Sequence, residues 1–340
     1  MSTDLIEAAV IEQSMVTLAL EADPTVNPLT LQTGTTALGP SPETSESSHQ
    51  RRDVKTSILH ANEELYQEQL KAKGGKEDMW QGGDLYYPNP PKIAHDVVIE
   101  DISGRERDFT LDNSGFFLAK HQFKSVVTTE DLGDTDKIKT QYYPELEEWL
   151  KKVTGASRVC IFDHAARIST STFQYNEFKK DPEAKKAPPQ PALFSAHLDY
   201  SSWHSGNLLH RYLPDETERL LHGRFMILNV WRPIKTVYKD PLGIAAAFSV
   251  APTDLVTRQA RIFKDINEAL SLKYSPAHKW YYKFAQQPDE VLVFKQFDNY
   301  GKTRGCPHAA FKDEEFVDRE GRESIEVRAL CFWPDFYDDK

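Results

Sequence analysis

The sequence predicts an α+β protein whose core is an antiparallel β-barrel or jelly roll with flanking helices. Two observations support this. Strand-like runs dominate the second half of the chain, whereas helical patterns are confined to one early segment and one in the middle. In addition, the chain has 340 residues, of which 39% are hydrophobic, so it can bury a large core.

The helical and strand-like segments follow in order. Residues 143–155, "YPELEEWLKKVTG", are predicted to form a helix, because they place apolar side chains at helical spacing and end at Gly155. Residues 157–164 follow as a strand, and residues 177–191 read as an exposed polar loop. A second helix is predicted over 252–272, with Thr253 or Asp254 near its N-cap. Five further runs are predicted as strands: 191–199, 223–233, 244–251, 289–299 and 324–333.

Residues 1–76 are predicted to form a largely flexible N-terminal extension, and residues 77–340 a single folded domain. The segment 24–53 is rich in Pro, Ser, Thr and Gly and nearly free of large apolar side chains, so it cannot repay the entropy of ordering. Residues 1–23 have an apolar periodicity that allows a short amphipathic helix. Because they lack a basic region and carry acids throughout, we expect neither a signal peptide nor a transit peptide.

Charge and cysteine usage narrow the class of partner. The formal net charge of −11 argues against a nucleic-acid binder, because phosphate recognition needs clustered Lys and Arg. No run of about 20 apolar residues predicts a membrane span. Three separated cysteines indicate neither a disulfide framework nor a zinc ribbon and suit a reducing compartment. We therefore expect a cytoplasmic protein that acts on a small molecule; the oligomeric state stays open.

A possible metal site begins in "FSAHLDYSSWH", residues 194–204. On a strand, side chains at i and i+2 share a face, so His197 and Asp199 project together. Two such ligands need a third imidazole from a distant strand to form the facial triad that binds iron(II), and "GCPHAAF" supplies His308. A lone H-x-D is a weak signal, since most instances are turns or hydrogen-bonded pairs.

The segment "RESIEVRALCFW" offers an anchor for an anionic cosubstrate. Arg322 and Ser324 lie on one strand face, and a guanidinium beside a hydroxyl suits a carboxylate. Arg328 lies further along the same face and is a competing candidate. In "NVWRP", Asn229 and Arg232 are candidates for contacts with cosubstrate or substrate, although a strand that packs Trp231 explains the motif equally well.

The order of these motifs resembles the iron(II)- and 2-oxoglutarate-dependent dioxygenases. More closely, "YYPELEEWL", "VCIFDHAARIS", "HLDYS", "LNVWRPIK", "DPLGIAAAFSV", "DEVLVFKQFDN", "PHAAF" and "RESIEVRALCFW" resemble, in order, the fungal hydroxylase and desaturase family related to gibberellin desaturase and the cephalosporin methoxylase subunit. The resemblance covers roughly residues 80–336. In "PLGIAAAFSV" the alanines stand where many relatives carry a polar or acidic residue.

The resemblance implies a double-stranded β-helix that binds iron(II) through His197, Asp199 and His308. It also implies 2-oxoglutarate as cosubstrate, with dioxygen as the third participant, and a role near the pocket for the segment that contains Asn229 and Arg232. The three open positions on the iron would receive the keto and carboxylate oxygens of 2-oxoglutarate and dioxygen. The expected outcome is hydroxylation, desaturation or cyclisation of a small molecule in fungal secondary metabolism.

Two other functions stay open on sequence alone. The triad could hold iron without 2-oxoglutarate, with Arg322 and Ser324 binding a substrate carboxylate. Alternatively, the jelly roll could be a cupin-like binding module without catalysis. A zinc hydrolase is disfavoured, because no H-E-x-x-H motif accompanies the histidines.

Overall fold

The computed structural model describes residues 51–72, 90–125, 127–169, 189–262, 265–300 and 305–333. Its helices are α2 (Glu63–Ala72), α3 (Thr135–Lys137), α4 (Tyr143–Thr154), α6 (Ser202–Tyr212) and α7 (Thr217–Leu221). Its strands are β1 (Val54–Ala61), β2 (Lys92–Asp101), β3 (Phe116–Lys120), β4 (Arg158–Ile168), β5 (His197–Leu198), β6 (Arg224–Pro233), β7 (Leu242–Ala245), β8 (Leu255–Ile262), β9 (Asp265–Leu272), β10 (Trp280–Tyr282), β11 (Glu290–Asp298), β12 (His308–Ala310) and β13 (Glu323–Trp333). None of the described helices is long and apolar enough to cross a membrane.

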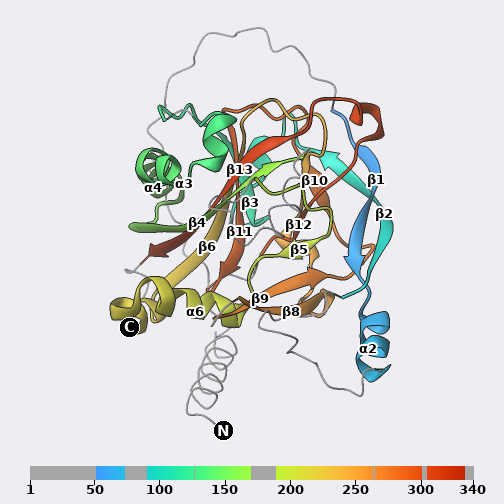
Figure 1. Ribbon diagram of the computed structural model, residues 1–340, viewed down its shortest axis with the longest axis horizontal. Helices are drawn as coiled ribbons and strands as arrows, with labels where there is room; N and C mark the ends of the chain where they lie inside the picture. Colours follow the sequence, from blue (N-terminus) through green and yellow to red (C-terminus); the bar gives the residue numbers. More distant parts are fainter. Residues whose placement is uncertain are drawn as a thin grey trace, which may run out of the picture. The chain divides into compact units, whose positions relative to one another are not determined.

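The strands form the two sheets of a jelly-roll core (Figure 1). The larger sheet has the order β1-β2-β10-β7-β12-β5-β9-β8 and the smaller one β3-β11-β6-β13-β4. The sheets face each other through a shared apolar cluster, in which Trp231 and Phe294 of the smaller sheet pack with Ile244 and Tyr281 of the larger one. The predicted jelly roll is therefore confirmed, and the space between the sheets is where a site can form.

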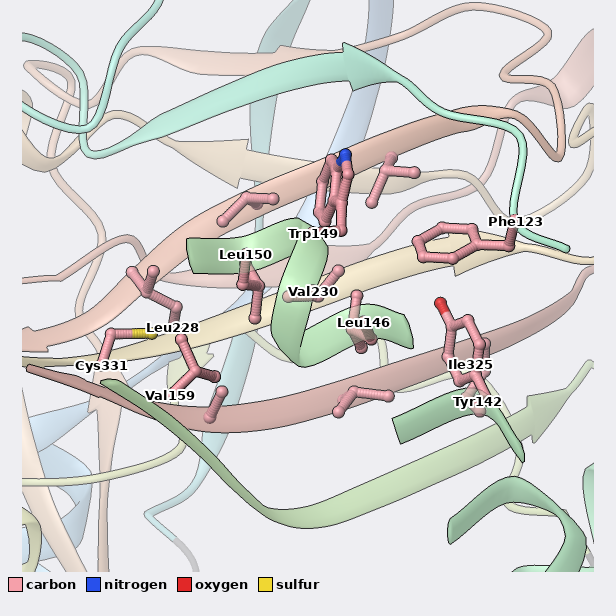
Figure 2. Close-up of a cluster of buried hydrophobic side chains, with 14 of the residues drawn as sticks. Phe123, Tyr142, Leu146, Trp149, Leu150, Val159, Leu228, Val230, Ile325 and Cys331 are labelled. Atoms are coloured by element: carbon pink, nitrogen blue, oxygen red, sulfur yellow. The ribbon is translucent and has the colours of Figure 1, made fainter. Parts of the chain in front are cut away.

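Helix α4 covers the outer face of the smaller sheet (Figure 2). Leu146, Trp149 and Leu150 are buried at the spacing the sequence predicts, and they pack on Val230 of β6 and Ile325 of β13. The helix ends where the sequence predicts, because Gly155 adopts a left-handed φ of 72° and donates its N–H to the carbonyl of Lys151. Because α4 covers this face of β6 and β13, the opposite face of the two strands points toward the larger sheet.

The prediction of a helix over residues 252–272 is wrong. The segment begins with a short 3-10 turn over 252–254, and then forms the antiparallel pair β8 and β9, with Leu255 opposite Leu272. The Asp254 carboxylate accepts the backbone N–H of Ala251, three residues before it, so Asp254 has the N3 position of this short turn and Ala251 is its N-cap. The hydrophilic, helix-favouring residues of this segment are overridden because β9 pairs with β5 at Ser271 and His197, which completes the sheet.

The remaining strand predictions differ mainly in length. The runs at 223–233, 289–299 and 324–333 form β6, β11 and β13 over nearly their full extent. In 191–199 only His197–Leu198 is a strand, and in 244–251 the strand stops at Ala245 before a 3-10 turn. The predicted loop at 177–191 and the possible helix at 1–23 lie outside the described residues, apart from the loop's last three positions.

The folded unit begins before the predicted boundary at residue 77. The compact unit starts at Arg51, and β1 pairs with β2 along its whole length, from Val54 opposite Ile99 to Ala61 opposite Lys92. Val54 and Ile58 are buried beneath this pairing. The sequence placed the boundary too late because the polar residues around 62–76 separate a single short strand from its partner.

A chain shortened to residues 51–340 should retain the stability of the full chain, whereas one that begins at Glu77 should be strongly destabilised. The second chain loses β1, and burial of side chains such as Val54 and Ile58 contributes about 1.5–3 kcal/mol each. Chemical denaturation of the two chains measures the difference. Equal unfolding midpoints would contradict the assignment of β1 to the folded unit.

His60 on β1 should make the folded state lose stability in mild acid. Burial, with the charges of His95 and His278, lowers the pKa of His60 from 6.5 to about 4, despite its contact with the Ile58 carbonyl. Between these two pH values His60 is protonated in the unfolded chain but not in the folded chain. The free energy of unfolding therefore decreases by roughly 3 kcal/mol as the pH is lowered from 6.5 to 4. His60→Gln should flatten this slope between pH 6.5 and 4, and the same change at the exposed His210 should not. An unchanged slope in His60→Gln would refute this.

Candidate functional site

His197 and Asp199 lie together at the end of β5, as the H-x-D spacing predicts. His197 is buried, and its Nδ1 lies 2.8 Å from the carbonyl oxygen of Ser195, which leaves Nε2 available as a ligand. Asp199 Oδ1 lies 3.4 Å from that Nε2. The backbone N–H of Asp199 donates to Gln296 Oε1 on β11, which fixes the turn that follows the strand.

His308 joins this pair through strand pairing. It is the first residue of β12 and lies directly opposite His197 in the antiparallel register. Its Nδ1 lies 3.4 Å from the Cys306 carbonyl, so Nε2 again faces the other ligands. Gly305 permits this approach, because a Cβ there would lie 2.6 Å from the Gln296 carbonyl oxygen. One ligand atom from each of the three side chains lies within 4.8 Å of the others.

The protonation states suit a metal ligand set. Burial, reinforced by the charge of His197, lowers the pKa of His308 to about 3, so its imidazole is neutral at neutral pH. Burial alone would raise the pKa of the Asp199 carboxyl, but the charge of Arg328 and a hydrogen bond with His197 hold it well below its usual range. Two imidazoles and one carboxylate are the donor set that non-haem iron(II) accepts.

A cavity opens beside the three ligand residues, between the two sheets. Its lining consists of Arg167, Leu193, His197, Trp231, Leu242, His308, Ala310, Arg322 and Glu326. The wall is therefore mixed: apolar side chains from both sheets stand next to two guanidinium groups and one carboxylate. Such a combination suits a small polar molecule held against apolar surface.

Arg322 and Ser324 are both buried on the inner side of the smaller sheet. Arg322 Nη1 donates to the Asp240 carbonyl oxygen at 2.8 Å, its Nε has no hydrogen-bond partner among the described residues, and its Cζ lies 5.6 Å from the ring centre of Trp231. Ser324 Oγ is likewise without a partner in the described chain. Burial, together with the charge of Arg167, lowers the pKa of Arg322 to about 10.

Arg328 is engaged by three carboxylates of the protein. Its Nε donates to Asp199 Oδ2 at 2.9 Å, its Nη1 to Asp163 Oδ2 at 2.7 Å and its Nη2 to Glu326 Oε1 at 2.9 Å. Although burial opposes the charge, Asp199 and its other anionic neighbours raise the pKa of Arg328 well above its usual value. Of the two competing arginines, Arg322 is therefore the one without a carboxylate partner among the described residues.

The two residues chosen from "NVWRP" are separated by the pleat of β6. Asn229 faces inward, where its Nδ2 donates to Asp199 Oδ2 at 2.8 Å, so it contacts a member of the candidate ligand group. Arg232 faces the opposite side and stacks between Phe123 and Tyr142, with its Cζ 5.0 Å from each ring centre. The expectation that Arg232 contacts the pocket is not supported, because it is three positions after Asn229 on the same strand and therefore points to the opposite face.

Three inward residues were missed or given less weight by the sequence reading. Glu326 lines the cavity with its Oε2 4.0 Å from His308 Nε2, and Gln296 supports Asp199 from β11. Arg167 also lines the cavity, with its Nη1 donating to the Pro191 carbonyl at 2.9 Å. The alternation Arg322, Ser324, Glu326, Arg328 on one strand was the signal that could have identified Glu326.

Two histidines near the motifs have structural contacts. His164 Nδ1 lies 2.6 Å from the hydroxyl oxygen of Tyr143 on α4. His204 Nδ1 accepts the N–H of Glu268, and its ring stacks on Tyr200 at 5.3 Å between centres. Neither belongs to the three-residue ligand group.

Comparisons with known proteins agree with this geometry. A family model described as an oxidoreductase/YMDC permease-like domain matches residues 59–332. The chain is 35% identical to the alpha-ketoglutarate-dependent dioxygenase phiK of Fungal sp. over 66% of this chain and 80% of the relative. It is 32% identical to the hydroxylase/desaturase efuI of Hormonema carpetanum over 70% of this chain and 84% of that relative.

The fold is also found among solved structures. The iron and alpha-ketoglutarate-dependent endoperoxidase NvfI superposes with a TM-score of 0.67 at 24% identity, covering 82% of this chain and 98% of the solved chain. The chain therefore belongs to the fungal family of iron(II)- and 2-oxoglutarate-dependent dioxygenases and hydroxylase/desaturases.

Proposed function

We propose that His197, Asp199 and His308 bind iron(II) in this oxygenase, and that Arg322 with Ser324 binds the distal carboxylate of 2-oxoglutarate. The enzyme then hydroxylates, desaturates or cyclises a small molecule. The relatives' names carry the reaction class: a dioxygenase that depends on alpha-ketoglutarate and a hydroxylase/desaturase. The assignment of residues rests on the site itself.

The observation that carries the assignment is the charge around the cavity. Two of its lining residues, Arg322 and Arg167, have no carboxylate partner among the described residues, and three ligand atoms converge beside them. 2-Oxoglutarate is a dianion with carboxylates at its two ends. Its keto acid end fits the metal and its distal carboxylate fits a buried guanidinium with an adjacent hydroxyl.

The protein's own groups have separable tasks. Bound iron(II) supplies the oxidation chemistry, in which 2-oxoglutarate is decarboxylated and a substrate C–H bond is attacked. Arg322 donates hydrogen bonds and fixes one end of the cosubstrate, and Trp231 packs beneath the guanidinium. Leu193, Leu242 and Ala310 exclude water from the metal's neighbourhood. Orientation and dryness are therefore what the chain contributes.

Anaerobic addition of iron(II) and 2-oxoglutarate tests the proposed function directly. The chelated complex should show its weak visible charge-transfer band, and admission of air should release succinate. If iron binds but addition of 2-oxoglutarate produces neither the band nor succinate, the enzyme would be an iron oxidase driven by its substrate. If no metal binds, the cupin-like binding module becomes the better description.

His197→Ala, Asp199→Ala and His308→Ala should each lose most bound iron and nearly all succinate formation. Each change removes one of three ligands, and the remaining two cannot keep the facial geometry. Iron content and succinate release are measured together, with His210→Ala as a control, because that histidine is exposed on α6. Near-normal values of both in any one ligand variant would remove that residue from the triad.

Arg322→Leu should raise the apparent dissociation constant for 2-oxoglutarate by about ten- to a hundred-fold, because it removes a charge-assisted contact worth roughly 1.5–3 kcal/mol. Iron binding should survive, since no ligand is touched. The matched control is Arg219→Leu, which removes an exposed arginine that pairs with Glu216. An unchanged 2-oxoglutarate constant in Arg322→Leu would refute its role as the anchor.

A further inference from the structure

We propose that Arg328 is a positioning residue that separates two buried carboxylates: it holds Asp199 for the metal and keeps Glu326 off it. The inference deepens the proposed function and rests on its assignment of the iron ligands. It gives a role to Arg328, which was expected to bind cosubstrate, and to Glu326, for which the sequence predicted none.

The first step is the geometry of the guanidinium. Arg328 lies on β13, and each of its three nitrogens donates to a different carboxylate, on Asp199, Asp163 and Glu326. Because a guanidinium is planar and rigid, it fixes the positions of its partners relative to each other. These three contacts leave it engaged with the protein instead of facing the cavity, whose lining includes Glu326 and excludes Arg328.

The second step is the division of the Asp199 oxygens. Oδ2 accepts two hydrogen bonds, from Arg328 Nε at 2.9 Å and from Asn229 Nδ2 at 2.8 Å. Oδ1 points to the ligand group, 3.4 Å from His197 Nε2. With Oδ2 occupied, the carboxylate offers the metal one oxygen, which leaves the remaining positions for other ligands.

The third step is the location of Glu326. This carboxylate is 4% exposed, and its Oε2 lies 4.0 Å from Nε2 of His308, a member of the three-residue ligand group to which Glu326 itself does not belong. A carboxylate oxygen is a ligand that iron(II) accepts. Its other oxygen, Oε1, is held by Arg328 Nη2 at 2.9 Å. Without that contact, Glu326 is free to become a fourth protein ligand in a position that 2-oxoglutarate needs.

The inference predicts opposite effects on metal and cosubstrate in one pair of variants. In Arg328→Leu the released Glu326 competes with 2-oxoglutarate, so we expect the cosubstrate to bind about ten-fold more weakly while the metal stays bound. Adding Glu326→Gln to that variant removes the competing ligand. Relative to Arg328→Leu, the double variant should bind 2-oxoglutarate about ten-fold more tightly and the metal more weakly.

The experiment uses the full-length chain without oxygen. Affinity for 2-oxoglutarate is read from the charge-transfer band of the iron(II) complex, and affinity for the metal from titration with Co(II) alone. The matched control compares Arg322→Leu with the double variant Arg322→Leu/Glu326→Gln. It measures the gain in 2-oxoglutarate affinity that follows merely from removing a carboxylate from the cavity. Recovery must exceed that gain to support the proposal. Arg219→Leu controls for loss of an arginine.

Two results would overturn the proposal. One is an Arg328→Leu protein that binds 2-oxoglutarate as the unmodified chain does. The other is a double variant whose cosubstrate affinity does not exceed that of Arg328→Leu by more than the control gain, as expected if Arg328 binds 2-oxoglutarate itself. Should Arg328→Leu not fold, Arg328→Lys replaces it, since lysine keeps the charge but cannot span both carboxylates.

The proposed function and this inference fail in different ways. If the unmodified chain shows no band with iron(II) and 2-oxoglutarate, the cosubstrate assignment fails. The Co(II) titrations still decide the inference in that case, because they need no cosubstrate. Metal affinity must fall from Arg328→Leu to the double variant, and equal or tighter binding in the double variant would overturn it.

Discussion

The pairing of β12 with β5 is the contact on which the site depends. It sets His308 opposite His197, so two imidazoles from distant parts of the sequence meet in one register, and Asp199 follows at the strand's end. A shift by one residue would turn His308 to the other face of the sheet. Gly305 allows the close approach just before His308, and β9 supports β5 from its other side.

Burying ionised groups between two sheets requires that each have a partner. The smaller sheet supplies partners for Asp199 from its inner face, since Arg328 on β13 and Asn229 on β6 both donate hydrogen bonds to this carboxylate. The same arginine holds Glu326. Arg322, by contrast, has only a carbonyl acceptor and an unpartnered Nε within the described chain. One strand face thus carries an arginine engaged with the protein and another available for an anion.

The fold and the ligand set were largely predictable because they rest on local patterns. Period-two alternation identified β6, β11 and β13, helical spacing identified α4, and the H-x-D spacing placed His197 and Asp199 on one face. The segment 252–272 was predicted wrongly, because a helix-favouring composition gave way to pairing with β5. The start of the folded unit was also predicted too late, since β1 acquires its stability only from β2.

By itself, then, the sequence determined the jelly roll, the three side chains that meet as a candidate ligand group and the set of arginines that could meet a cosubstrate. The tertiary structure decided how those arginines differ. Arg322 and Arg328 share a strand face, so alternation cannot separate them, and only the carboxylates brought near by other strands do. Likewise Asn229 and Arg232 are close in sequence, but the pleat of β6 turns one to Asp199 and the other to Phe123 and Tyr142. Partners of this kind come from long-range packing, which no local pattern encodes.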